Sequence, residues 1–124
     1  MKETIKFDDF FDVMAAPLEA IGYIEIAFHV EGDDFYNECW MGKGKDNETG
    51  KEANWFGLTP NGENAFDYED VVSFVNSEVF NGKSLKDIWN KVVIDKIDWC
   101  NPEERFQDYI YFRDRWNNKK REHK

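Results

Sequence analysis

Residues 22–30 read GYIEIAFHV, and this stretch decides the fold. Its apolar and polar side chains alternate, with two sets that fall on opposite sides: Ile24, Ile26, Phe28 and Val30 against Tyr23, Glu25, Ala27 and His29. A repeat of two residues is the side-chain period of a β-strand. The stretch therefore predicts a half-buried strand, with one face in the core and the other outside it.

The residues that follow predict a meander of further strands. EGDD at 31–34 is typical of a turn, and 35–41 predicts the returning strand of a hairpin. A polar loop is expected over 42–52, then a third strand over 54–59 that ends at PNG, residues 60–62. Short connections of this kind favour antiparallel pairing.

A helix is expected before the first strand, over residues 8–21, with Asp8 or Asp9 as its N-cap. Pro17 removes an amide donor and disfavours α geometry in the residue before it. We therefore expect a kink or two short helices in this region.

Three helices and a strand are expected in the second half. Asp67 is expected to cap a helix that runs to about Val79. Ser84 and Asp87 have the spacing of a capping box for the next helix. A fourth strand is expected over 92–99, followed by a helix that begins at Pro102 and has Phe106, Tyr109, Ile110 and Trp116 on one side.

The order of these elements is α-β-β-β-α-α-β-α. It predicts an α+β fold, a single-domain antiparallel sheet of about four strands with helices packed on it. A chain of 124 residues is too short to divide into two pieces that each bury a sizeable core. One domain is therefore expected.

Charge is unevenly distributed along the chain. The formal net charge is −10, yet residues 113–124 hold six basic groups against two acidic ones, a net of +4, which leaves −14 on residues 1–112. We expect 1–112 to form an acidic α+β domain that includes most of the C-terminal helix, and 113–124 to be its basic helix end and frayed tail. An acidic body repels phosphate backbones and anionic lipid, which disfavours binding to nucleic acid or membranes through the main surface. The basic tail is the only exception, and it lacks a recognition motif for nucleic acid.

The N-terminal sequence MKETIKFDDF lacks the pattern of a signal peptide, and no stretch reaches the roughly 20 apolar residues of a membrane helix. A cytoplasmic location is therefore expected, with Cys39 and Cys100 as free thiols. Frequent Asn and Lys suggest a bacterial or phage genome.

Several short patterns resemble chemical motifs without completing them. Gly82-Lys83-Ser84 lacks the earlier glycine of a phosphate loop and is expected to be a turn with an N-cap. Residues 46–50, DNETG, lack the calcium-loop spacing. Two His and two Cys do not match a zinc pattern. No metal and no cofactor are therefore expected.

No catalytic constellation stands out in the sequence. Cys100 precedes a helix N-terminus, where a thiol is activated, but the two histidines lie on another strand and in the tail. The many carboxylates are explained as helix caps and solvated faces. An enzyme is therefore disfavoured, although the question stays open.

One surface is the candidate binding site. If helices cover the side of the sheet that bears Ile24, Ile26 and Phe28, the opposite side mixes aromatics with carboxylates, as protein-binding surfaces do. The alternative is that the C-terminal helix covers this side. The candidate residues are Tyr23, Glu25, His29, Tyr36, Glu38, Trp40 and Trp55.

Three functional hypotheses follow. The first is a non-enzymatic module that docks on a basic protein, as immunity proteins and phage-encoded nuclease inhibitors do. The second is a small-ligand binder or small enzyme with a sheet-floored pocket that uses Glu25, His29 or Cys100. The third is a self-associating accessory protein in which the aromatic side forms a homodimer interface.

Overall fold

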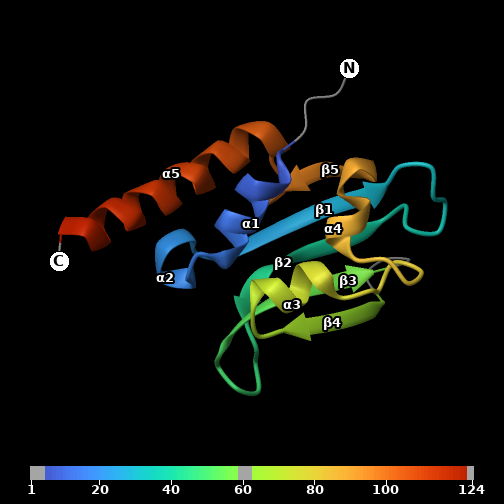
Figure 1. Cartoon of the computed structure of the whole chain (residues 1–124), viewed down its shortest axis with the longest axis horizontal. Helices are drawn as coiled ribbons and strands as arrows, with labels where there is room; N and C mark the ends of the chain where they lie inside the picture. Colours follow the sequence, from blue (N-terminus) through green and yellow to red (C-terminus); the bar gives the residue numbers. More distant parts are fainter. Residues whose placement is uncertain (1–4, 59–62, 123–124) are drawn as a thin grey trace.

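The computed structural model describes residues 5–58 and 63–122 and shows an antiparallel sheet with helices packed on one face (Figure 1). In spatial order the five described strands are β4-β3-β2-β1-β5. Each pairs with its neighbours in antiparallel register. Their bounds are β1 Ile24–Val30, β2 Cys39–Lys45, β3 Glu52–Leu58, β4 Asn64–Tyr68 and β5 Val92–Ile97.

Helices precede, interrupt and follow the strands in the chain. Their bounds are α1 Phe7–Ala15, α2 Leu18–Ile21, α3 Val71–Asn76, α4 Leu85–Ile88, the 3-10 turn η1 Trp89–Lys91, and α5 Pro102–Glu122. Figure 1 shows α1, α3 and α4 in front of the sheet, while α5 runs beside α1 and projects beyond the sheet. None of the described helices combines the length and the apolar character that crossing a membrane requires.

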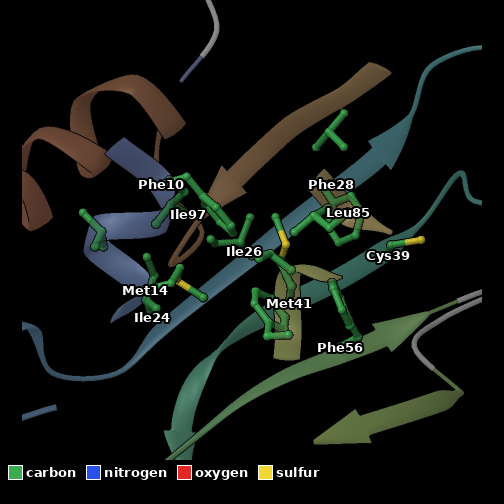
Figure 2. Close-up of a cluster of buried hydrophobic side chains, with 14 of the residues drawn as sticks. Phe10, Met14, Ile24, Ile26, Phe28, Cys39, Met41, Phe56, Leu85 and Ile97 are labelled. Carbon is green, nitrogen blue, oxygen red and sulfur yellow. The ribbon is translucent and has the colours of Figure 1, made fainter. Parts of the chain in front are cut away.

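The hydrophobic core lies between the sheet and these helices. It contains the alternating apolar side chains of β1, together with Met41 of β2 and Phe56 of β3. Phe10 and Met14 of α1 pack onto them from the helical side (Figure 2). Phe56 also stacks on Phe74 of α3, with ring centroids 4.3 Å apart. The predicted buried face of residues 22–30 is therefore confirmed.

The α+β class is confirmed, but the predicted element order and strand number differ from those observed. The strand missing from the prediction is β4, an edge strand whose first four residues are exposed, so it has little of the apolar alternation that reveals a strand. The second strand is Cys39–Lys45 rather than 35–41, because glycines 42 and 44 made its second half look like a loop. The predicted turn at 60–62 lies outside the described residues.

Helix ends also differ from the predictions in several places. α1 begins without a side-chain cap from Asp8 or Asp9, and α3 is capped by Asp70 rather than Asp67. The sequence predicts that the last helix frays after Trp116. In the structure α5 stays helical to Glu122. The capping box of α4 and the break between α1 and α2 are confirmed.

The break at Pro17 is stabilised from the sheet by a buried lysine. Lys43 of β2 donates from its Nζ to the carbonyl oxygen of Met14 at 2.9 Å, and Asn54 of β3 donates to the same oxygen at 3.3 Å. Glu52, whose Oε1 is 3.7 Å from Lys43 Nζ, accepts from the backbone amide of Leu18 at 3.1 Å. Side chains of the sheet therefore satisfy both helix ends that the proline exposes.

Burial of the Lys43 ammonium gives a testable pH dependence. Desolvation lowers the pKa of Lys43, although the Glu52 carboxylate partly opposes it. The folded state therefore loses this proton at a lower pH than the unfolded state, and the cost of burying the charge disappears as pH rises from that lowered pKa toward about 10.5. We expect the unfolding free energy of Lys43→Met, minus that of wild type, to decrease steadily over this range.

Urea denaturation at a series of pH values measures this difference. Lys96→Met, at an exposed position of β5, is the matched control. A difference for Lys43→Met that stays constant from neutral to alkaline pH would contradict the expectation.

Candidate binding surface on the open sheet face

The second face of the sheet is not covered by the described helices. α5 packs against α1, α2 and β5, on the same side as the core, and its Phe106 and Tyr109 are buried there. The sequence left open whether this helix covers the aromatic side, and in the described structure it does not. Tyr23 and Trp99 are exposed on that side, while Trp40 and Trp55 are half-buried. We call the uncovered surface the open face, and it carries Tyr23, Glu25, Ala27, His29, Trp40, Trp55, Asp67 and Trp99.

Most of the predicted site residues lie on or beside this face. Tyr23 is 63% exposed just before β1, and the exposed Glu38 lies just before β2. Tyr36 does not belong to it, because only 5% of it is exposed and its ring packs on Phe80 in the core. Its hydroxyl donates to the carbonyl oxygen of Val79 at 3.2 Å, which holds the 31–38 connection on the helical side.

One row across the open face places an indole between two carboxylates. Register pairs Asp67 with Trp55, Trp55 with Gly42, and Gly42 with Glu25. A side chain on Gly42 would meet the Trp55 ring, since a Cβ built there lies 2.7 Å from Cζ2 of the indole. The indole therefore lies across β2, over a glycine, with Asp67 to one side and Glu25 to the other.

A pocket of about 730 Å³ opens beside this indole. Trp55 and Tyr23 contribute its aromatic surface, and Gly44 and Ala53, which are partners in the register, lie beneath. The Tyr23 ring is 3.7 Å from the position that a Cβ of Gly44 would occupy. Small residues on β2 and β3 thus leave the space that the two rings enclose.

The pocket is strongly acidic. Its lining includes two lysines and five carboxylates, a formal charge of −3: Lys43 and Lys45 against Glu25, Asp46, Glu48, Asp67 and Asp98. The ammonium of Lys43 is directed away, to Met14 under the helices. Within the described part of the chain, Glu25, Glu48 and Asp67 form no ion pair. An incoming cation would therefore find unpaired carboxylates beside aromatic rings.

Asp98 joins the pocket to α5. One carboxylate oxygen accepts from the backbone amide of Glu25 at 3.0 Å, and the other accepts from Arg105 Nε at 2.9 Å and contacts the Tyr109 hydroxyl. The Tyr109 hydroxyl also lies 2.8 Å from the carbonyl oxygen of Tyr23. Burial first, and the Asp98 carboxylate second, raise the pKa of Tyr109 well above its ordinary value.

The turn that contains Asp98 also positions an exposed indole. Asp98 and Trp99 have φ of 52° and 66°, in the left-handed region that favours glycine, and Ile97 and Cys100 bond to each other across them. Trp99 is 69% exposed and lies over Trp40, with ring centroids 5.2 Å apart. A two-residue turn, in which Trp99 is unfavourable at positive φ, therefore extends the open face with a pair of indoles.

Of the three candidates for a pocket-based activity, Glu25 lines the pocket, whereas His29 and Cys100 do not. His29 Nδ1 is 2.9 Å from Asp95 Oδ2 at the surface of the sheet, and Cys100 Sγ contacts the backbone carbonyl of Asp98. No group of three or more metal-ligating side chains occurs in residues 5–58 and 63–122. The calcium-like loop is a turn in which Asp46 accepts from the amides of Glu48 and Thr49.

Sequence reasoning missed three residues of the surface. Asp67 was assigned to a helix cap, while Asp98 and Trp99 were placed inside a strand rather than in a turn. The pattern offered only a weak signal for this turn, since Asp98 suits positive φ but Trp99 does not, whereas both residues of the Asn81-Gly82 turn do. Comparisons with known protein families, with curated proteins and with solved structures find no match to this chain.

The close contact at Gly42 predicts an asymmetry between two glycines of one strand. Gly42→Ala would place a Cβ 2.2 Å from the carbonyl oxygen of Ile24 and against the Trp55 ring. We expect the free energy of unfolding to fall by about 1–3 kcal/mol. Gly44→Ala, whose nearest contact is an ordinary 3.7 Å, should change it by less than about 1 kcal/mol. Equal effects in urea denaturation would contradict this packing.

The contacts of Asp98 predict that its loss destabilises the fold more than the loss of Asp108, the other carboxylate that pairs with Arg105. Asp98→Asn keeps a residue that tolerates positive φ but replaces a carboxylate that faces Arg105 and Tyr109. We expect it to lower the free energy of unfolding by about 1–3 kcal/mol. Asp108→Asn removes the exposed second partner of Arg105 and should cost less than about 1 kcal/mol. Thermal unfolding that is equal in both variants would contradict the central role of Asp98.

Proposed function

We propose that this protein is a non-enzymatic binding module that docks through its open face on a basic surface of a protein partner. The observation that carries the proposal is a sheet face, uncovered by the described helices, that brings the exposed rings of Tyr23 and Trp99 and the half-buried indoles of Trp40 and Trp55 together with Glu25 and Asp67, which form no ion pair within the described residues. Tyr and Trp supply large contact areas in protein interfaces, and they dominate the energy of many of them. Exposed indole and phenol rings of this kind are uncommon on surfaces that contact only water.

Electrostatics favours a basic partner. The pocket has a formal charge of −3, and residues 1–112 as a whole carry −14. Such a surface steers a basic protein toward it and speeds association at low salt. It repels phosphate and therefore disfavours nucleic acid on this face.

Two alternatives use the same surface. A symmetric homodimer through the open face would set one acidic patch against its copy, which costs free energy unless the charges are neutralised. A small molecule would occupy the pocket alone and would leave Trp40 and the exposed Trp99 unused. A protein partner accounts for the pocket and for the Trp40–Trp99 pair together.

The test is affinity capture with paired baits. Wild type and Trp99→Asn/Glu25→Gln are used to capture partners from the native host at low and then moderate salt, and any stoichiometric basic partner is purified. Asn preserves the left-handed turn while the ring is removed, and the Glu25 side chain makes no ion pair in the described chain. By calorimetry we expect this variant to bind the partner at least about tenfold more weakly.

The matched control removes the same kinds of groups elsewhere. Tyr111→Asn/Glu78→Gln takes away an exposed ring on α5 and an exposed carboxylate after α3. It should retain affinity within about twofold. Recovery of the bait alone, or a partner that binds both variants like wild type, would refute the open face as the docking surface.

A further inference from the structure

We infer that the pocket between Tyr23 and Trp55 receives an arginine side chain of the partner as the anchor of the complex. The inference rests on the proposed function and specifies which chemical group the open face recognises. Complexes of this kind are anchored by a few deeply placed residues, among which Arg is enriched. The pocket has the two features that a guanidinium requires, aromatic faces and carboxylates with free oxygens.

The aromatic surfaces come from rings placed over small residues. The Trp55 indole lies against Gly42, and the Tyr23 ring lies beside Gly44. The space between the rings, above Gly44 and Ala53, belongs to the pocket. The methylene stem of a long cationic side chain can lie along these rings while its head stays at the rim.

The carboxylates are placed for the head group. Glu25 and Asp67 are in the same row as Trp55, on its two sides, and neither forms an ion pair within residues 5–58 and 63–122. Asp98 also lines the pocket, but Arg105 already pairs with it. A guanidinium stacked on the indole would thus pair with Glu25 or Asp67, whose oxygens are not otherwise engaged by a cation.

The contacts of Arg105, close to the pocket, show why a guanidinium suits this surface better than the ammonium of lysine. The guanidinium carbon of Arg105 lies 4.9 Å from the ring centroid of Tyr109, while its nitrogens pair with Asp98 and Asp108. This arrangement combines ring stacking with two carboxylates at once. A planar guanidinium suits it, whereas an ammonium is a compact charge that neither stacks nor forks.

The test uses three small probes and NMR of the whole chain. N-acetyl-arginine methylamide is titrated while the indole N–H signals are followed. The lysine analogue and the neutral citrulline analogue are titrated in parallel. We expect the arginine probe to shift the Trp55 signal most, and to bind at least about threefold more tightly than the lysine probe. Citrulline should bind at least about tenfold more weakly than arginine, since it keeps the shape and loses the charge.

Charge variants locate the effect. Glu25→Gln/Asp67→Asn should reduce the affinity for the arginine probe at least about fivefold. Asp34→Asn/Glu78→Gln removes the same charge from exposed positions after β1 and after α3, and should reduce it less than about twofold. Equal losses in the two variants, or equal affinities for arginine and lysine, would overturn the assignment.

Failure of this inference can be told apart from failure of the proposed function. If the purified partner still depends on Trp99 while no probe shifts Trp55, the open face docks the partner without an arginine anchor. If the chain instead self-associates at low salt and Arg115→Gln abolishes this, the occupant is the basic helix end of a second copy. Either result would overturn the arginine of a partner as the ligand.

Discussion

The Asp98 carboxylate, in the turn after β5, bonds both to β1 and to α5. It bonds the amide of Glu25 at the start of β1, the guanidinium of Arg105 in α5, and the hydroxyl of the fully buried Tyr109. The direction in which α5 leaves the sheet is set at this point, and Figure 1 shows the helix continuing along α1 rather than behind the strands. Together with the burial of Phe106 and Tyr109 in the core, this junction holds the start of α5 on the helical side of the sheet.

The two faces of the sheet have different physical requirements. On the helical side the alternating apolar residues of β1 pack with rings of α1 and α3, and a buried lysine and asparagine satisfy the carbonyl that the Pro17 break leaves free. On the open side glycines 42 and 44 remove side chains where Trp55 and Tyr23 need to lie. The same strand, β2, therefore stabilises the fold through Lys43 and shapes the surface through its glycines.

The residues that were predictable from the sequence are those whose neighbours in the chain determine their structure. The alternation over 22–30, the capping box of Ser84 and Asp87, the break at Pro17 and the helix after Asn101 each depend on local rules. β4 and the Asp98-Trp99 turn could not be predicted, because long-range contacts hold them in place. An exposed edge strand has no buried stripe, and Trp at the second position of a turn with positive φ opposes local preference. The open face was predicted for five of its residues, but the burial of Tyr36 depends on where the 31–38 connection folds, which alternation alone does not determine.

Trp99 has a consequence for how the protein can change over time. At a φ of 66°, a bulky residue such as Trp99 is less stable by about 1–2 kcal/mol than a residue that favours the left-handed region. Glycine or asparagine at this position would therefore relieve the strain. Selection for stability alone would replace the indole, and selection for the surface would retain it. A thermostabilised descendant that carries a small residue here would thus keep the fold and lose part of its aromatic face. At this turn, a gain in stability therefore comes at the expense of the binding surface.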